Sequence, residues 1–410
     1  MVNSFAGGGS YITDHRKKAN KRFLPYGRQT IDESDISAVV DVLRGDWLTT
    51  GPSINSFENA FSDVVGSEHA VACSSGTAAL HLMLLGLGVG PGDWVIVPSL
   101  TFLATANAVR YTGAEVYFAD VNPETGLLDT EHLSHALAKS NFEPKAIIAV
   151  HLNGQCASMR NLKECAGDIV LLEDACHALG SSEILSPEKS LKTGSCYYSH
   201  AAAFSSHAVK TIASGEGGVV TTNDRNFAEK LRLYRNHGMV RDTDELASNP
   251  WHYEMHSLGF NYRLTDIQCA LGRSQLSKLE GFVKKREKLR ERYSICLKML
   301  GPYVKPIDTI DGCKPAWHLA VALIDFEKLG IQRLDVMRKL SDLGVGTQVH
   351  YIPVHKQPYY QMRYGKFTLR GCEAYYSRCL SLPLWPDMTL AEVDFVVSML
   401  ADILGVKQKF

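Results

Sequence analysis

Short β-branched runs alternate with helical segments between residues 69 and 175. The run "DWVIVPS" at 93–99 is followed by "FLATANAVRYTG" at 102–113, and similar pairs recur up to "IVLLEDA" at 169–175. Because parallel strands are buried on both faces and are joined by helices, this alternation predicts βαβ units. We therefore expect an α/β protein with a mixed, mostly parallel sheet at the centre of a large domain.

Two helices are expected before the sheet. In 32–45 the apolar residues recur at helical spacing, and Gly45 can end the helix. In 47–66 a turn is followed by a second helix.

The pattern changes after residue 258. The sequence predicts one long helical region at 258–300, with charge on its outer face, and then a mixture of strands and helices. This mixture is typical of a smaller α+β domain. The expected strands are "HLAVALI" (318–324) and "GTQVHYIP" (346–353), and the expected helices are "IQRLDVMRKLSDLG" (331–344) and "TLAEVDFVVSMLADIL" (389–404).

The length of 410 residues exceeds one typical hydrophobic core, so two domains are expected. We predict a flexible N-terminal lead at 1–23, a large domain at 24–285 and a small C-terminal domain at 286–410. The lead is rich in glycine and then basic, and it lacks the apolar centre of a signal peptide.

Charge and cysteine usage narrow the class of protein. The net charge is -1 and no acidic or basic tail is present, which gives no case for a nucleic-acid or membrane partner. The ten cysteines are scattered without a CxxC pair, so neither a metal site nor a disulfide framework is expected. No run reaches the roughly 20 apolar residues that span a bilayer. A cytoplasmic protein fits these features best.

The segment "VACSSGTAALHLMLL" at 71–85 predicts an anion site. A strand enters a turn of Ser75, Gly76 and Thr77 that opens a helix, so free N–H groups and the positive end of the helix dipole point to one place. Phosphate is the usual ligand there. A simple N-cap by Ser75 or Thr77 explains the same residues equally well.

A second candidate site lies in "IVLLEDACHALGS" at 169–181. A buried strand ends at Glu173 and Asp174, and His177 follows three residues later. Ligands of α/β proteins bind at this edge of the sheet. A carboxylate there needs a cation or a donor, for which a protonated pyridine nitrogen would serve. An N-cap aspartate is the alternative.

The third candidate is Lys210, in "AAAFSSHAVKTIASGEGGVVTTND" at 201–224. Apolar neighbours favour partial desolvation, which lowers the pKa of an amine and makes it nucleophilic. A lysine at a turn with its ammonium in water is the alternative. Together, the lysine, the carboxylate and the anion turn match the aldehyde, ring nitrogen and phosphate of pyridoxal 5'-phosphate (PLP).

These motifs, with "NHGM" and "LGFNYRLTDIQCALGRSQL", resemble the DegT/DnrJ/EryC1/StrS family of sugar-nucleotide aminotransferases. The resemblance runs in order from about Leu24 to the C-terminus. It implies the type I PLP-dependent aminotransferase fold, L-glutamate as amino donor and a homodimer whose active sites are shared between subunits.

The resemblance also implies residue roles. Lys210 corresponds to the lysine that forms an imine with the cofactor, and Asp174 to the partner of the ring nitrogen. The other residues with an implied role at the cofactor are His177 and Phe102 on the two ring faces, Gly76, Thr77 and Ser205 at the phosphate, and Asn261, donated to the phosphate by the other subunit.

The segment "GVGTQVHYIPVHKQPYY" near the C-terminus, with "LPYGRQTIDESDISAVVDVLRGDWLTTGP" near the start, resembles one subgroup of the family. Its members form UDP-4-amino-4,6-dideoxy-N-acetyl-β-L-altrosamine in pseudaminic acid biosynthesis. This implies amination of a UDP-linked 4-keto-6-deoxy-N-acetylhexosamine. The segment places His350, Tyr351, His355, Gln357 and Tyr359 close together, a set of donors and aromatic faces suited to a sugar or uracil. The expected substrate-binding residues are His350, Tyr351, His355 and Arg263. A Pro-bounded strand and turn with half-buried tyrosines is the alternative for the segment.

Other readings are weighed on the same residues. The sequence departs from the family pattern at Ser206, where phenylalanine is common, and in "TIASGEGG", so the packing near the lysine is an open question. A related sugar 3-dehydrase carries histidine in place of the lysine, whereas position 210 is lysine here. Alternatives that remain are an aminotransferase for another nucleotide-linked keto sugar and a non-catalytic subunit, which would be expected to lose a cofactor contact.

Overall fold

The computed structural model describes residues 23–241 and 248–407. Its centre is a seven-stranded sheet of order β1-β9-β8-β5-β4-β2-β3. Strand β9 is antiparallel to both neighbours, and the other adjacent pairs are parallel, as the pattern predicted. The strands are β1 (His69–Cys73), β2 (Trp94–Pro98), β3 (Glu115–Ala119), β4 (Ala146–Val150), β5 (Val170–Asp174), β8 (Ala201–Ser205) and β9 (Gly218–Thr222).

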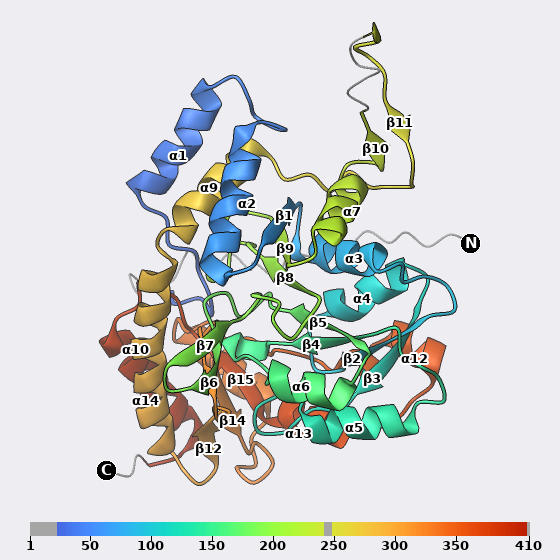
Figure 1. Ribbon diagram of the computed structural model, residues 1–410. Helices are drawn as coiled ribbons and strands as arrows, with labels where there is room; N and C mark the ends of the chain where they lie inside the picture. Colours follow the sequence, from blue (N-terminus) through green and yellow to red (C-terminus); the bar gives the residue numbers. More distant parts are fainter. Residues whose placement is uncertain (1–22, 242–247, 408–410) are drawn as a thin grey trace, which may run out of the picture.

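Helices cover both faces of this sheet (Figure 1). Val95 and Val97 of β2 share a core with Leu80 of α3, whereas Ile96 between them shares a core with Leu133 of α5. Burial on both faces explains why the strands are continuously apolar. The helices of this part are α1 (Glu33–Arg44), α2 (Pro52–Val65), α3 (Gly76–Gly86), α4 (Leu103–Tyr111), α5 (Thr130–Lys139), η1 (Leu152–Gly154), α6 (Met159–Ala166), α7 (Arg225–Arg235) and α9 (Asp266–Leu276).

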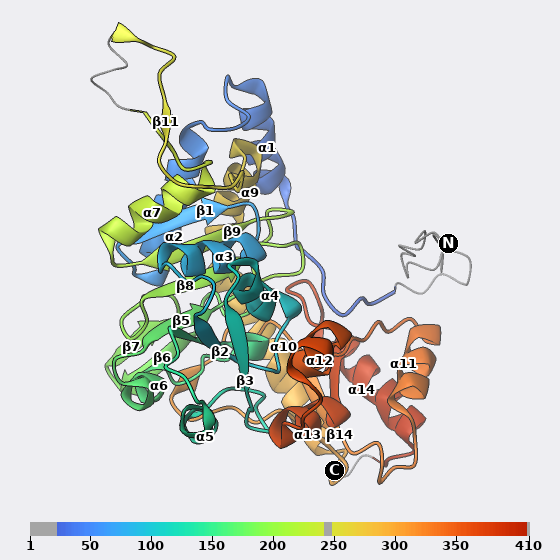
Figure 2. The same cartoon turned by 90° about the vertical axis from the view of Figure 1, so that its right-hand side faces the viewer.

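The C-terminal elements form a second, smaller body beside the sheet, drawn in orange and red in Figure 2. An antiparallel sheet of order β12-β14-β15 packs in a core with Tyr293 and Trp385, and this core also includes Leu100 and Val150 of the large part. The elements are α10 (Leu279–Lys298), β12 (Val304–Pro306), β14 (Ala320–Ile324), α11 (Arg333–Asp342), η2 (Val354–Lys356), α12 (Pro358–Tyr364), α13 (Arg370–Arg378), β15 (Cys379–Leu382) and α14 (Leu390–Leu404).

Helix α10 joins the two bodies. Its first residue, Leu279, belongs to a core under the large sheet, and Leu289 and Tyr293 belong to the small core. The predicted division near 285 falls inside this helix and stays a prediction, and the predicted lead at 1–23 lies outside the described residues except for Phe23.

Short strands complete the fold. Strand β6 (Ser182–Ser186) pairs with β7 (Lys189–Lys192) and with β13 (Cys313–Lys314). Strands β10 (Met239–Val240) and β11 (Glu254–Met255) pair in an arm that projects from the large sheet (Figure 1). Along the described ranges, no helix has both the length and the apolarity that a membrane crossing needs.

Two of the expected elements were wrong. Residues 258–300 are not one helical region, because α9 begins only after Thr265, whose side chain caps it, and α10 starts anew at Leu279. The expected strand at 346–353 is mostly irregular: only Gln348 forms a bridge, with Ser381. Consecutive residues of this segment, 348–352, line a cavity, so it does not have the two faces of a pleated strand.

Candidate active site

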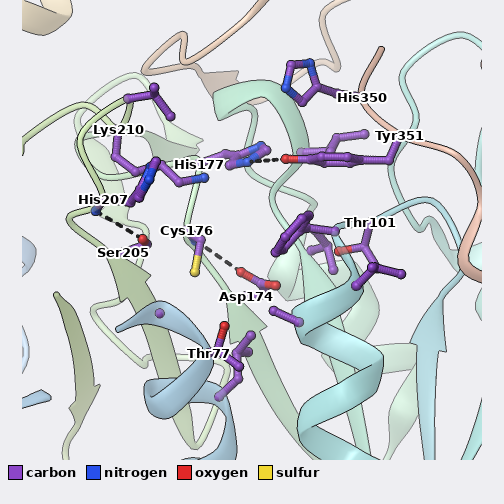
Figure 3. A pocket seen from close by; sticks show the side chains of 18 of the residues that line it. Thr77, Thr101, Asp174, Cys176, His177, Ser205, His207, Lys210, His350 and Tyr351 are labelled. Atoms are coloured by element: carbon purple, nitrogen blue, oxygen red, sulfur yellow. Dashed lines mark hydrogen bonds between the residues drawn. The ribbon is translucent and has the colours of Figure 1, made fainter. Parts of the chain in front are cut away.

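A cavity of about 630 Å³ lies between the two bodies, at the carboxyl ends of β5 and β8. It is the place where the predicted cofactor residues meet (Figure 3). The predicted site residues that line it are Gly76, Thr77, Phe102, Asp174, His177, Ser205, Lys210, His350 and Tyr351.

Lys210 lies in the loop after β8, and its backbone N–H donates to the carbonyl of His207 at 2.8 Å. Burial lowers the pKa of Lys210, an effect larger than the opposite influence of Cys176 and Asp174. A lowered pKa increases the fraction of neutral, nucleophilic amine. This residue can therefore attack a carbonyl group in the cavity.

Ser206 and Ser214, from the two segments that depart from the family pattern, contact each other near Lys210. Ser206 and Ser214 are buried, and their hydroxyl oxygens are 2.6 Å apart. A Cβ on Gly217 would lie 2.3 Å from Oγ of Ser206, so the space next to the pair is filled. The two hydroxyls satisfy each other, which resolves the open question about packing near the lysine.

Asp174 ends β5 and is buried. Its Oδ2 accepts a hydrogen bond of 2.7 Å from the hydroxyl of Thr105 in α4, and its Oδ1 accepts one of 3.2 Å from the N–H of Cys176. The two donors fix the orientation of the carboxylate, which is therefore ready to accept a proton-bearing nitrogen in the cavity. Sequence reasoning missed Thr105.

His177 is buried beside this carboxylate, and its Nε2 lies 3.1 Å from the hydroxyl of Tyr351. Burial, followed by the charges of Lys210 and His350, holds the pKa of His177 well below its usual range. The imidazole is therefore neutral. Tyr351 comes from the small body, so this contact joins the two sides of the cavity.

The first turn of α3 forms the opposite end of the cavity. The side chain of Ser75 accepts from the N–H of Ala78, so Ser75 is the N-cap, while Gly76 and Thr77 line the cavity. A Cβ on Gly76 would lie 2.8 Å from Cβ of Ser205, so only glycine lets the helix approach that close. The helix N-terminus and the Ser205 hydroxyl together suit an anion.

Phe102 stands at the mouth of the cavity. Its side chain is 54% exposed, and its ring centroid lies 5.7 Å from that of Tyr351. An exposed aromatic face next to a cavity suits a flat ligand.

Three predicted residues do not line this cavity. Asn261 is exposed and bridges Asn236, and Arg263 donates to the side chain of Asn236 at 2.7 Å. His355 is buried, with Nδ1 2.7 Å from the hydroxyl of Ser99 and its ring stacked on Phe367. Its contacts are those of a packed core histidine.

The cavity also contains residues that sequence reasoning did not select. Examples are Tyr26, Thr101, Glu216 and Gln348. Gln357, which the sequence placed close to His350 and Tyr351, also lines the cavity, whereas nothing local distinguishes Tyr26 or Thr101.

The residues present fit PLP. Lys210 suits the aldehyde, the oriented carboxylate of Asp174 suits a protonated ring nitrogen, and the α3 N-terminus with Ser205 suits the phosphate. Among the residues that the structure describes, no group of three or more His, Cys, Asp or Glu side chains could hold a metal ion.

Solved structures of sugar aminotransferases resemble this chain. Helicobacter pylori PseC, an aminotransferase involved in the biosynthesis of pseudoaminic acid, has a TM-score of 0.84 at 30% identity, covering 94% of this chain and 100% of that one. The PLP form of the putative sugar aminotransferase Spr1654 from Streptococcus pneumoniae has a TM-score of 0.82 at 26% identity, covering 93% and 99%. Fold, cavity and relatives define a PLP-dependent sugar aminotransferase with the type I fold.

Sequence comparison gives the family. The model of the DegT/DnrJ/EryC1/StrS aminotransferase family matches residues 29–401. The spore coat polysaccharide biosynthesis protein SpsC of Bacillus subtilis is 39% identical over 389 residues, which cover 93% of this chain and 97% of SpsC. The chain belongs to the DegT/DnrJ/EryC1/StrS aminotransferase family.

Proposed function

We propose that this enzyme moves the amino group of L-glutamate to the 4-keto group of a UDP-linked 4-keto-6-deoxy-N-acetylhexosamine. The observation that carries the proposal is the meeting of Lys210, Asp174 and the α3 N-terminus in one cavity whose far wall contains His350 and Tyr351. The likeness to PseC and the "HYIPVHKQPYY" segment support the choice of sugar.

In this proposal PLP supplies an electron sink for the carbanion formed at the reacting carbon. Lys210 anchors the cofactor, and its Nζ then takes the proton from the α-carbon of the amino donor and returns a proton during transfer. The carboxylate of Asp174 holds the proton on the ring nitrogen. Neutral His177 and Phe102 would lie against the ring, and Thr77 and Ser205 would hold the phosphate.

We further propose a homodimer with shared sites. Asn261 is exposed and does not line the cavity of its own chain, and the N-cap of α9 is Thr265, so capping does not account for Asn261. These facts support a role of Asn261 at the phosphate in the partner's cavity, with Arg263 beside it at the substrate. The shared dimer stays a prediction. The cytoplasmic location, which the pattern of single cysteines favours, also stays a prediction.

The substrate roles differ in support. His350 and Tyr351 line the cavity, which supports direct contact with the sugar. His355 lies outside it, so we assign His355 to the support of the wall near Gln357.

The test is an amination assay. The purified enzyme is loaded with PLP and incubated with L-glutamate and a panel of UDP- and dTDP-linked 4-keto sugars, and each product is identified by mass and NMR. We expect a 4-amino product from the UDP-linked 4-keto-6-deoxy-N-acetylhexosamine. Turnover of only another nucleotide sugar would select the alternative aminotransferase, for which the likeness to SpsC, a polysaccharide biosynthesis protein, gives some support. No amination of any sugar would contradict the proposal.

A further inference from the structure

The first described residues form a strap that is tied to the small body. The N–H of Leu24 donates to the carbonyl of Gly344 at 2.8 Å, and the N–H of Gly346 donates back to Leu24 at 2.8 Å. The N–H of Leu384 donates to the carbonyl of Tyr26 at 3.0 Å. Leu24 is 4% exposed and belongs to the small core. The strap, residues 23–30, is therefore fixed in place before the chain enters α1.

This strap carries the side chain of Tyr26 to the cavity. The ring lies against His350, with centroids 5.3 Å apart and planes tilted by 54°, and it lines the cavity wall. The hydroxyl has no hydrogen-bond partner among the residues of 23–241 and 248–407. Burial raises the pKa of Tyr26, so the hydroxyl stays protonated and can both donate and accept. A group that enters the cavity, water included, can therefore hydrogen-bond this hydroxyl.

The chemistry of the surrounding wall indicates what enters. Tyr26 is joined by Gln348, His350, Tyr351 and Gln357. These are amides, phenols and an imidazole whose pKa burial lowers to about 3, so the wall is neutral. Neutral donors, acceptors and aromatic faces suit a sugar ring, whereas the two carboxylates of an amino-acid donor require cations. The wall therefore serves the sugar and not the amino donor.

We propose that Tyr26 is a specificity-determining residue whose hydroxyl hydrogen-bonds the keto-sugar substrate, held at the cavity by the strap. This role rests on the proposed function. It gives the segment before α1 a part in substrate recognition, beyond the cofactor contacts and the "HYIP" segment. One neutral hydrogen bond made equally in the bound and reacting states affects KM more than kcat.

The two half-reactions of the enzyme separate this role from a structural one. Tyr26→Phe keeps the ring against His350 and removes only the hydroxyl. Tyr303→Phe is the matched control, since Tyr303 belongs to the small body, is 39% exposed and does not line the cavity. The half-reaction with L-glutamate is followed as the loss of the cofactor's visible absorbance band. The half-reaction with the sugar is followed as amination of the keto sugar by enzyme that has already reacted with L-glutamate.

For Tyr26→Phe we expect a donor half-reaction within about twofold of wild type and a KM for the sugar raised about threefold to tenfold, the loss of one hydrogen bond. Tyr303→Phe should match wild type in both halves. Unchanged sugar kinetics in Tyr26→Phe, or equal losses in both halves, would overturn the role of Tyr26 while leaving the proposed function standing. A wild-type enzyme that reacts with L-glutamate but aminates no keto sugar would overturn both.

Discussion

Thr105 is the residue on which the position of Asp174 depends most directly. Its side chain is fully buried, and its hydroxyl donates to Oδ2 of Asp174 at 2.7 Å while lying 2.7 Å from the hydroxyl of Thr101. Thr105→Val keeps the shape of the side chain and removes the donor. The carboxylate then retains only the N–H of Cys176, at the longer distance of 3.2 Å. We expect it to turn away from the ring nitrogen of PLP.

The size of the effect follows from the charge on the acceptor. A hydrogen bond to a charged group contributes about 1.5–3 kcal/mol, and about 1.4 kcal/mol is a tenfold change in affinity. Thr105→Val should therefore bind PLP about tenfold to a hundredfold more weakly, the upper end being reached if water does not replace the hydroxyl. The assay is titration of the cofactor-free variant with PLP, followed by the visible absorbance.

The control is Thr112→Val at the other end of α4, where the hydroxyl donates to the carbonyl of Val109 at 2.8 Å and does not line the cavity. It should bind PLP like wild type. If Thr105→Val also bound PLP within about twofold of wild type, Asp174 would not need this donor and the reasoning would be refuted.

Three further predictions test other parts of the site. Asp174→Asn has nearly the same shape but no charge, so kcat should fall by orders of magnitude more than PLP affinity, and equal losses would mark a purely structural residue. Inactive Lys210→Ala mixed with an inactive Asn261→Ala variant should regain partial activity after subunit exchange, because one site of each heterodimer holds both native residues; no recovery after proven exchange would rule out the shared site. Burial, and next the charge of His177, hold the pKa of His318 well below its usual range. His318 is therefore neutral in the folded protein but becomes protonated in the unfolded chain, so stability is lost as pH falls below about 6.5. In urea unfolding, His318→Asn should lose about 1.4 kcal/mol less than wild type between pH 7.5 and 5.5, and an identical acid loss would contradict the shift.

The sequence was informative where neighbours along the chain determine the structure at a residue. Strand β4 is apolar at every position because both of its faces are buried, and α3 begins at the predicted turn because Ser75 caps it. Asp174 and Lys210 could be found because one ends a strand and the other lies in the loop after a strand, and both strand ends are clear from the pattern.

The remainder depends on contacts between distant positions. Thr105 is 69 residues from Asp174, and the wall residue Gln348 is part of an irregular segment that the sequence predicted as a strand. Tyr26 reaches the cavity because backbone hydrogen bonds hold the strap against residues more than 300 positions away. No local pattern marks such residues, since their role exists only once the two bodies are packed together.

The most direct test of the whole account locates the covalent attachment of PLP. The loaded enzyme is reduced with borohydride and digested, and the modified peptide is identified by mass spectrometry, with Lys210→Ala as the control. The account predicts a single pyridoxyl group on Lys210 and none in Lys210→Ala, which should stay folded but inactive. A pyridoxyl group on another lysine, or turnover near wild type by Lys210→Ala, would contradict it.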